Sequence, residues 1–308
     1  MFTAYADVVK SMTEAGIGPA DPLTTSLKEA RITQDRYFAF LGSDLPPVDR
    51  VEDAHVEGPA VPIPLRIFFP PGTGPFPVVV FLRGAGWWAG GIDSHARTAR
   101  LIAIESGLAV CAVGYHCSPE FKCPVQLKEA LCAIHWLRNN AAGLRLDGSN
   151  VVLWGESAGA NLSLGASQAL RDEDEGSPCG LILFYGNFAG PSPASRPYSK
   201  WVWEQYLCDP SQAKDPRAVP LLGEMRGLPP MWLGVGDADP LIKDTLALAE
   251  KLRAAAIPHQ VTLYPGLPHG FAMLNRIFEG AVAAIRDASR SAQAFVHAAA
   301  PQGQLEVI

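Results

Sequence analysis

Apolar runs alternate with amphipathic patterns along most of the chain. Short runs of mainly apolar and β-branched residues predict buried strands at residues 78–82, 108–113, 151–154, 181–185, 231–235 and 260–264. Between them, apolar positions with helical spacing predict helices at residues 124–140, 158–171, 242–256 and 276–299. Because strands buried on both faces alternate with helices, the pattern predicts an α/β protein with a mostly parallel central sheet flanked by helices.

The pattern departs from this alternation at the N-terminus and in one internal segment. Residues 2–14 and 23–41 have helical spacing around a break rich in Gly and Pro, and residues 56–69 alternate as in an edge hairpin. Residues 187–230 are rich in Pro, Ser and aromatic residues and contain no strand pattern. We therefore expect an N-terminal helical cap segment at residues 1–50. The remaining residues, 51–308, are expected to form one α/β domain with a cap insertion at about residues 187–220.

The composition suits a well-packed protein that acts on small molecules. Hydrophobic residues make up 48% and charged residues 18% of the chain, so we expect a large core and little disorder. The net charge of −6 and the absence of a basic cluster argue against a nucleic-acid partner. No apolar stretch reaches the roughly 18 residues that a membrane span needs.

The N-terminus and the cysteines bear on localisation. Residues 1–10 lack the basic start and the apolar stretch of a secretory signal. The six cysteines form no CxxC pair and no zinc spacing with histidine, so we expect reduced thiols and no metal site. These features predict a cytoplasmic protein and leave its oligomeric state open, with a homodimer as one option.

The sequence GESAG at residues 155–159 is the sharpest chemical signal. It follows the apolar run at residues 151–154 and begins a predicted helix, which is the setting of a nucleophile elbow. So tight a turn strains the backbone of Ser157, and the flanking glycines leave room for it. The hydroxyl of Ser157 is then exposed at the carboxyl edge of the sheet, where we predict that it acts as a nucleophile.

A serine nucleophile needs a general base, which in this arrangement follows the last strand. His269 satisfies that condition, because it lies in the loop after residues 260–264. His259 begins the last strand and His297 lies in the terminal helix, so both are weaker candidates. The other four histidines precede the serine in the chain. We therefore predict that His269 is the base.

The acid that orients the base is expected after the strand at residues 231–235. Asp237, Asp239 and Asp244 all follow that strand. Asp239 precedes a proline in a loop that can direct its carboxylate to an imidazole, whereas Asp244 falls inside the next helix. The sequence favours Asp239, with Asp237 as the second choice.

An oxyanion hole requires backbone N–H groups that can approach the substrate. The sequence RGAG at residues 83–86 follows the strand at residues 78–82, where this fold supplies a Gly-rich donor loop. Ala158, at the start of the helix after Ser157, supplies a further N–H group.

Over about residues 60–300, the chain resembles the hormone-sensitive-lipase family of α/β-hydrolase fold esterases. GESAG is joined by the sequence YHCSPE at residues 115–120, which is similar to the family's YRLAPE block. DPL at residues 239–241 and HGF at residues 269–271 match its acid and histidine motifs, and residues 201–222 resemble its cap-to-core segment. The resemblance implies that Asp239 is the acid. It also implies that the amides of Ala85, Gly86 and Ala158 form the oxyanion hole.

Two departures from the family pattern concern the oxyanion loop. RGAG stands where the family has HGGG, so the histidine that normally holds the loop is replaced by Arg83. Arg83 either binds a substrate carboxylate or phenolate, or it lies at the surface or braces the loop. Ala85 costs about 1 kcal/mol if its position requires a positive φ. His116 and Cys117 also replace the family's Arg-Leu.

These features predict a carboxylesterase-type serine hydrolase that needs no cofactor and acts on a small-molecule ester. We expect small to medium esters, because the sequence has no long apolar lid helix. Six residues near the predicted mouth are candidate substrate contacts, with lid packing as the alternative role of the aromatic ones: Arg83, Trp87, Trp88, Trp201, Tyr206 and Phe271. The altered loop motivates a non-hydrolytic alternative, a lyase, dehydratase or cyclase of a secondary metabolite. A small-molecule receptor is a weaker alternative, because such receptors lose the histidine that is present here.

Overall fold

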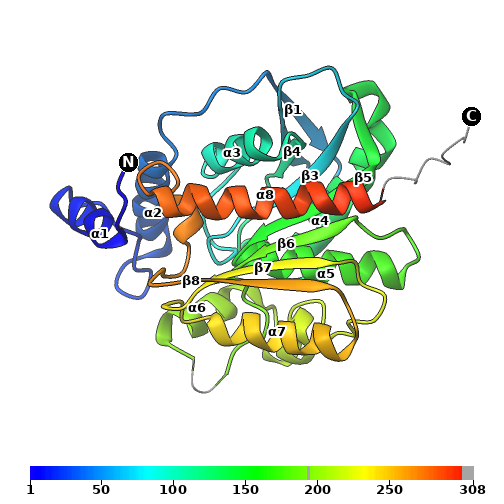
Figure 1. The fold of residues 1–308 in the computed structure, drawn as a ribbon. Helices are drawn as coiled ribbons and strands as arrows, with labels where there is room; N and C mark the ends of the chain where they lie inside the picture. The colour runs from blue at the N-terminus through cyan, green and yellow to red at the C-terminus, as the bar shows by residue number, and fades with distance from the viewer. Residues whose placement is uncertain (193–194, 300–308) are drawn as a thin grey trace, which may run out of the picture.

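The fold is built on one central sheet. A computed structural model describes residues 1–192 and 195–299, and these contain a sheet of eight strands in the order β1-β2-β4-β3-β5-β6-β7-β8 (Figure 1). The strands are β1 (Arg50–Val56), β2 (Ile63–Phe69), β3 (Phe76–Leu82), β4 (Ala109–Val113), β5 (Leu146–Glu156), β6 (Gly180–Phe184), β7 (Met231–Gly236) and β8 (His259–Tyr264). The strands from β4 to β8 in this order are parallel. At one edge, β2 runs antiparallel to β4, and β1 runs antiparallel to β2. The predicted α/β architecture, with a mostly parallel sheet flanked by helices, is confirmed.

The edge hairpin differs from its prediction in its first strand. β1 begins at Arg50 rather than at Val56 and pairs with β2 from Arg50 opposite Phe69 to Val56 opposite Ile63. The residues of β1 alternate between half-buried and exposed positions. Because β1 has only one neighbouring strand and its inner face is only half-buried, that face includes Arg50 and Glu52, and its sequence lacks the apolar alternation on which the prediction depended.

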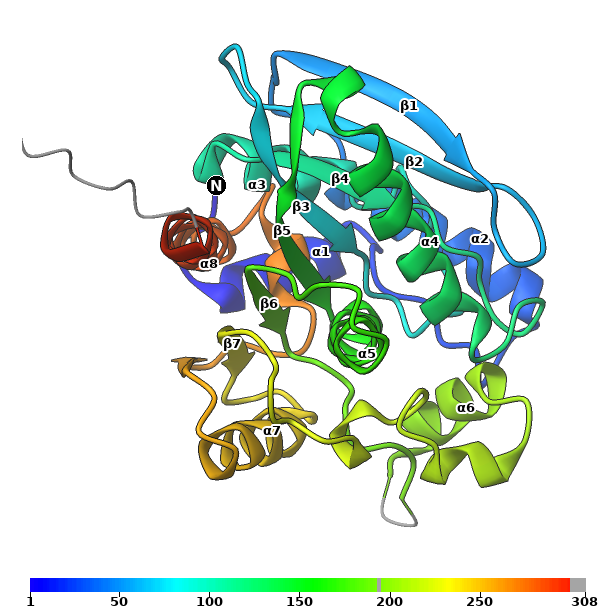
Figure 2. The same ribbon diagram turned by 90° about the vertical axis from the view of Figure 1, so that its right-hand side faces the viewer.

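Helices cover both faces of the sheet, which explains the continuous apolar runs. α3 (Ala96–Ser106) and α8 (Glu279–Ala299) lie on one face; α4 (Val125–Asn140), α5 (Ala158–Asp172) and α7 (Ile242–Ala254) lie on the other (Figure 2). In β3, Val79 and Phe81 pack toward α3 and α8, while Val78 and Val80 pack toward α4 and α5. Each strand residue is therefore buried on one side or the other.

Helix α3 was not predicted from the sequence. Its buried side is built mainly from small residues such as Ala99 and Ala103, together with Ile102. Arg97 and Arg100 interrupt the apolar pattern, and both guanidinium groups donate to backbone carbonyls. The helix ends at Gly107, whose φ of 65° suits a left-handed cap. A buried face of alanines gives too weak a periodic signal for prediction.

The first 50 residues contain two helices that join the core. α1 (Tyr5–Glu14) and α2 (Leu27–Leu41) lie beyond one end of α8, at the left of Figure 1. Ser26 and Glu29 form a reciprocal capping box at the start of α2. Phe38 of α2 is 2% exposed, and Phe2 forms a parallel β-bridge with Phe278. The N-terminal segment is therefore anchored at both of its ends.

The internal insertion contains helix but no strand in the part that the structure describes. α6 (Pro197–Tyr206) is its main element, followed by the short 3-10 helices η2 (Pro210–Lys214) and η3 (Pro220–Leu222). A further 3-10 helix, η1 (Ala142–Leu144), precedes β5, and η4 (Phe271–Leu274) precedes α8. Residues 193–194 of the predicted cap insertion and residues 300–308 of the predicted domain lie outside the described residues.

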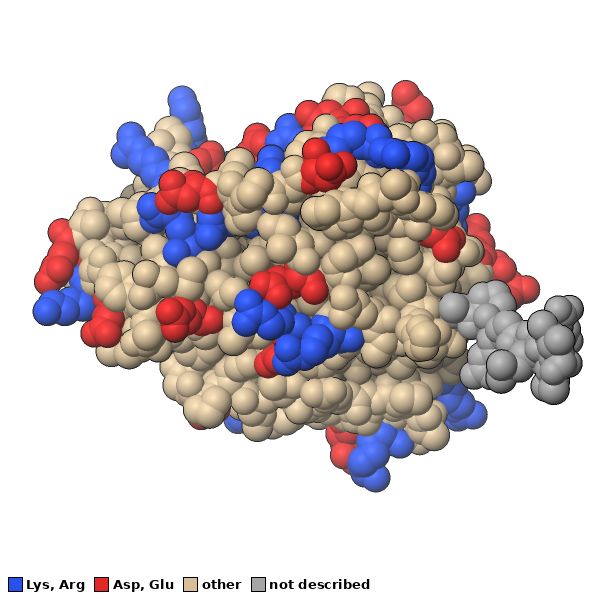
Figure 3. Space-filling model, turned by 45° about the horizontal axis from the view of Figure 1, so that its top comes forward, with Lys and Arg blue, Asp and Glu red and all other residues tan. Residues whose placement is uncertain are grey.

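The surface carries both signs of charge. Figure 3 shows Lys and Arg interspersed with Asp and Glu over one face of the molecule. Among the described residues, no helix is both long enough and apolar enough to traverse a bilayer. All six cysteines are free thiols, and no cluster of metal-ligating side chains occurs within residues 1–192 and 195–299.

Candidate active site

The strand-to-helix turn after β5 holds Ser157 in a strained conformation. Its φ of 51° and ψ of −112° lie where residues other than glycine rarely occur. The amide of Ser157 donates to the carbonyl of Phe184 at 2.9 Å, and the carbonyl of Ser157 accepts from Asn161 at 3.2 Å. These bonds fix the turn between β5, β6 and the first turn of α5, so the strain is held by surrounding structure.

The glycines of GESAG are required by close backbone contacts. A Cβ added at Gly159 would collide with the carbonyl oxygens of Leu82 and Arg83, and one at Gly155 would collide with the backbone of Gly159. The elbow therefore packs directly against the end of β3. This contact brings the loop after β3 beside the serine, since a Cβ at Gly84 would lie 3.5 Å from the Cβ of Ser157.

Three side chains from three loops form a continuous hydrogen-bonded series. His269 Nε2 lies 2.8 Å from Ser157 Oγ, and His269 Nδ1 lies 2.9 Å from Asp239 Oδ2. The carboxylate of Asp239 is fully buried, whereas the imidazole of His269 is 32% exposed. The structure thus brings together the serine, the histidine and the first-choice aspartate, with the geometry that a base needs to remove the serine proton.

The three candidate aspartates have different partners. The second carboxylate oxygen of Asp239 accepts from the amide of Leu241 at 2.7 Å, so both its oxygens are engaged. Asp237 is exposed and accepts from the amide of Gly266 at 2.6 Å, which braces the turn before the histidine loop. Asp244 lies inside α7, and its carboxylate accepts from two amides at the start of the insertion. Burial raises the pKa of Asp244. Among the three, Asp239 alone contacts His269.

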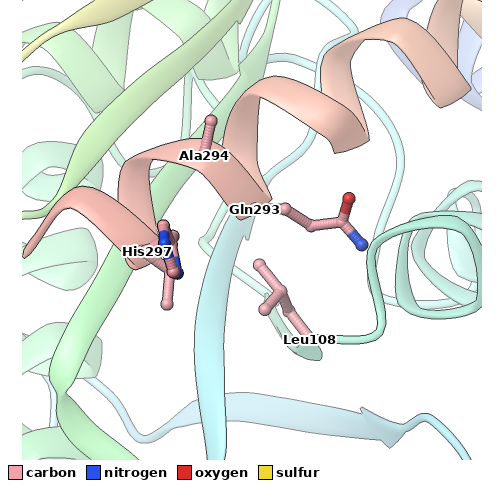
Figure 4. A pocket seen from close by; sticks show the side chains of 5 residues that line it. Leu108, Gln293, Ala294 and His297 are labelled. Carbon is pink, nitrogen blue, oxygen red and sulfur yellow. The ribbon is translucent and has the colours of Figure 1, made fainter. Parts of the chain in front are cut away.

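The other histidines lie away from Ser157 or have structural partners. His116 pairs with the buried Glu129 at 2.7 Å, and His95 is buried with its Nδ1 2.8 Å from Ser94 Oγ. His297 lines a shallow hollow with Gln293 of α8 and Leu108, which precedes β4 (Figure 4). Since Leu108 lies at the amino end of β4 and Ser157 at the carboxyl end of the parallel β5, this hollow is at the opposite edge of the sheet.

The loop that follows β3, residues 83–90, is termed the oxyanion loop here. Ala85 and Gly86 lie in it at φ values of 82° and 58°, and the amide of Trp88 closes a turn onto the carbonyl of Ala85 at 3.2 Å. Within the described part of the chain, the amides of Ala85, Gly86 and Ala158 donate to no protein acceptor. Three N–H groups near the serine are therefore free to bind an anionic oxygen.

The positive φ of Ala85 leads to a testable expectation. A residue with a Cβ pays about 1 kcal/mol or more in this region, which glycine does not pay. We expect Ala85→Gly to raise the free energy of unfolding by about 0.5 kcal/mol, since greater freedom of the unfolded chain offsets part of the relief. Urea denaturation measures this change. Ala89→Gly, at a buried position without positive φ, should instead destabilise the protein. If both variants lowered the free energy of unfolding equally, the strain at Ala85 would be contradicted.

Arg83 is buried and braces the loop, which agrees with the bracing alternative and corrects its candidate role in substrate binding and at the surface. Its side chain is 2% exposed, and Nη2 donates to the carbonyls of Gly90 at 2.8 Å and Tyr115 at 3.1 Å. Nη2 also lies 3.1 Å from the Cys117 sulfur, and the guanidinium lies 3.8 Å from the centre of the Tyr115 ring. Tyr115 in turn donates its hydroxyl to the carbonyl of Arg83. The side chain spans the oxyanion loop from its first residue to its last.

Four of the aromatic candidates are core residues rather than pocket walls, which corrects the sequence-based list of substrate contacts. Trp87, Trp88, Tyr206 and Phe271 are at most 1% exposed. Trp87 stacks on Tyr206 of α6 with ring centres 4.0 Å apart, and Trp88 donates its indole N–H to the hydroxyl of Tyr198. The large apolar areas of Trp87, Trp88 and Tyr206 stabilise the contact between α6 and the oxyanion loop, whereas Phe271 packs on Tyr185. Trp201, against the ring of Trp88, remains half-buried.

Two further groups at the site were missed by reasoning from the sequence. A Cβ added at Gly86 would lie 3.2 Å from Cγ1 of Val202, so α6 borders the oxyanion loop at that point.

Tyr185 contacts His269 edge to face with ring centres 5.0 Å apart, and it donates its hydroxyl to the buried carboxyl of Glu156 at 3.1 Å. Burial raises the pKa of Glu156 to about 7. The acidic residue within GESAG was the available signal, but only the fold shows that it points into the core.

The raised pKa of Glu156 predicts a pH-dependent stability. Between the ordinary pKa of 4.5 and about 7, the folded protein retains a proton that the unfolded chain releases, so stability falls as pH rises through this window. Glu156→Gln imitates the protonated acid and removes the loss. We expect the wild type and Glu156→Gln to have equal free energies of unfolding near pH 4.5. Above about pH 7, the variant should be more stable by about 3 kcal/mol. Urea denaturation across this range would contradict the shift if the two stability curves ran parallel.

The sequence matches a family model described as the alpha/beta hydrolase fold over residues 79–273. Two characterised relatives are similar to most of the chain. The carboxylic ester hydrolase LipN of Mycobacterium tuberculosis (strain ATCC 25618 / H37Rv) is 32% identical over 253 residues, which cover 76% of this chain and 67% of that protein. The ethyl acetate hydrolase of Pseudomonas putida is 28% identical over 236 residues, which cover 71% and 74% of the two chains.

Solved structures agree with the sequence comparisons. A hyperthermophilic esterase from Pyrobaculum calidifontis superimposes with a TM-score of 0.89 at 25% identity, over 97% of this chain and all of that one. EstE1, a thermostable carboxylesterase from a metagenomic library, superimposes with a TM-score of 0.85 at 25% identity, over 89% and 99% of the two chains. The agreement extends over nearly the whole of each molecule.

Proposed function

The chain belongs to the α/β-hydrolase fold family, and we propose that it hydrolyses small to medium carboxylic esters with Ser157 as its nucleophile. It is an ester hydrolase of the carboxylesterase type, and the resemblance to the hormone-sensitive-lipase family is confirmed. The observation that carries the assignment of residues is the series from Ser157 through His269 to the buried Asp239, beside three free amides.

Acylation of the serine is the first half of the proposed reaction. His269 Nε2 accepts the proton of Ser157 Oγ as the oxygen attacks the ester carbonyl. Asp239 accepts the hydrogen bond from Nδ1–H, which holds the tautomer with a free Nε2 and stabilises the imidazolium. The carbonyl oxygen becomes an anion and receives hydrogen bonds from the three amides. The imidazolium then gives its proton to the departing alcohol.

Deacylation repeats these steps with water. His269 removes a proton from a water molecule as it attacks the acyl carbon, and the same amides hold the second oxyanion. Collapse of this intermediate releases the carboxylic acid and returns the proton to Ser157. The N-terminus of α5 faces the anion, and its dipole adds to the stabilisation. The chain's own groups and water are sufficient for both halves.

The proposed substrate size follows from the position of α6. Val202 borders Gly86 of the oxyanion loop, and the stacked aromatic side chains fix α6 in that place. A wall so close to the anion-binding amides limits the group that extends past it. The name of one relative, ethyl acetate hydrolase, indicates a short ester as the substrate of that protein. Both points support esters with short chains.

Several predictions from the sequence remain proposals. We propose that residues 1–50 and the insertion at about residues 187–220 cap the catalytic domain at residues 51–308, since α2 and α6 both contact the oxyanion loop. A cytoplasmic location, the absence of a nucleic-acid partner and the option of a homodimer are likewise proposals that rest on the sequence. The non-hydrolytic and receptor alternatives are not favoured, because the characterised relatives are ester hydrolases.

The proposed function is tested by p-nitrophenol release from acetate, butyrate and octanoate esters. We expect turnover of all three, fastest with acetate or butyrate, with equal amounts of acid and phenol formed. A preference for octanoate would contradict the proposed short pocket. No release above the buffer rate, or an elimination product from a β-acyloxy substrate, would contradict ester hydrolysis by this site.

A further inference from the structure

Near its start, helix α2 contacts the oxyanion loop through the side chain of Arg31. Arg31 Nε donates to the carbonyl of Trp88 at 2.9 Å, and Nη2 donates to the carbonyl of Ser118 at 2.7 Å. Both terminal nitrogens also bind the carboxylate of Glu120, at 2.8 and 2.7 Å. The guanidinium is therefore shared by three partners in two segments far from α2 in the sequence.

We propose that Arg31 is a positioning residue for the oxyanion hole, which makes the N-terminal segment a working part of the active site. This inference rests on the proposed function, because it concerns the amides that would hold the anion. Arg31 acts through the carbonyl of Trp88. Trp88 belongs to the turn that its own amide closes onto Ala85, so fixing the Trp88 carbonyl fixes the directions of the neighbouring amides.

The oxyanion loop needs such external support. Ala85 and Trp87, neither of which is glycine, have φ values of 82° and 62°, and unconstrained residues of this kind leave that region. Arg83 holds the loop from the inner side through Gly90, and the amide of Ser118 holds it through the carbonyl of Trp87 at 2.9 Å. Arg31 supplies the outer contact and links the loop to the turn that contains Ser118.

The position of Arg31 on α2 makes this contact stable. Its neighbour Ala30 is 1% exposed, so this side of the helix is packed on the core. About two turns farther along the same helix, the ring of Phe38 would lie 3.2 Å from a Cβ at Gly90, the last residue of the loop. α2 therefore meets the loop at two points. A lysine at position 31 would carry the charge but not the planar fork that reaches partners in several directions.

The test compares Arg31→Gln and Arg31→Lys with Arg36→Gln, which changes an exposed arginine on the same helix. The measurements are kcat and KM for p-nitrophenyl acetate, the inhibition constant of phenylboronic acid and the melting temperature. The boronic acid forms a tetrahedral adduct with a nucleophilic serine and so reports on the oxyanion hole. Because oxyanion donors act on the transition state, a misplaced hole lowers kcat and leaves KM nearly unchanged.

We expect Arg31→Gln to lower kcat about tenfold, to change KM less than about twofold and to weaken boronic acid inhibition about tenfold, as a partial loss of oxyanion stabilisation requires. Arg31→Lys should lower kcat severalfold. If Arg31→Gln does not fold, the lysine variant alone is compared with the wild type and with Arg36→Gln. Arg36→Gln should behave as the wild type. Unchanged kcat in a folded Arg31 variant, full activity with lysine, or a fall in kcat with unchanged boronic acid inhibition would overturn the inference. A wild-type protein that neither turns over esters nor binds the boronic acid would instead contradict the proposed function.

Discussion

Ser157→Ala is expected to lower kcat for p-nitrophenyl acetate by at least about 10⁴-fold, because loss of a serine nucleophile removes the covalent path and leaves only substrate binding and the oxyanion hole. KM should change little, since the hydroxyl of Ser157 contributes to bond formation more than to binding. The rate of p-nitrophenol release at saturating substrate measures the effect. The melting temperature of the variant should match that of the wild type or exceed it, because alanine keeps the strained backbone and adds no clash.

Ser163→Ala provides a matched control on the same helix. Ser163 is buried in α5, and its hydroxyl donates to the carbonyl of Gly159 at 2.9 Å without contacting His269. Its removal should change kcat less than about threefold, since buried hydroxyls of this kind affect stability by about 1 kcal/mol. If Ser157→Ala were as active as Ser163→Ala and the wild type, hydrolysis would have to occur elsewhere on the protein.

Asp239→Asn is expected to lower kcat by about 10³- to 10⁴-fold. The asparagine amide would donate to Nδ1 of His269 and so favour the tautomer that carries its proton on Nε2, which cannot accept the proton of Ser157. The geometry of the site would be nearly unchanged. Substrate binding should therefore persist, and the loss should lie in kcat, measured with the same ester.

Asp237→Asn separates the two leading candidates for the acid. Its side-chain oxygen can still accept the hydrogen bond from the amide of Gly266, so we expect kcat within about threefold of the wild type, as for most exposed substitutions. If Asp237→Asn were inactive and Asp239→Asn active, the assignment of the acid would be reversed. A large loss in both variants with lowered melting temperatures would indicate collapse of the histidine loop instead.

The sequence was most informative where one short segment determines the local structure. GESAG contains in five residues the end of a strand, a strained turn and the start of a helix, and each of its glycines is required by a backbone contact within or next to the turn. The sheet was predictable for a similar reason. Strands covered on both faces must be apolar throughout, so their positions follow from composition alone.

The sequence was least informative about side chains whose partners lie far away in the chain. The sequence left Trp87 open as a substrate contact or a lid-packing residue, and only the fold shows that its ring stacks on Tyr206, more than 100 residues later. For Arg83 the sequence left open a substrate-binding, a surface and a loop-bracing role, because a cation is rarely buried without a carboxylate and no such partner is evident in the sequence. Its partners are mainly backbone carbonyls and the ring of Tyr115, and carbonyls leave no trace in the sequence. The network around Arg31 was hidden for the same reason.

The bridge between Phe2 and Phe278 joins the first residues of the chain to the segment before its last helix. The carbonyl of Phe2 also accepts from the amide of Glu279, the first residue of α8. During synthesis, chains emerge N-terminus first and domains fold as they become complete. Helices α1 and α2 leave the ribosome well before residues 278 and 279, yet this contact cannot form until those two residues have been made. Docking of Phe2 must therefore follow the synthesis of every strand of the sheet, since β8 ends at Tyr264.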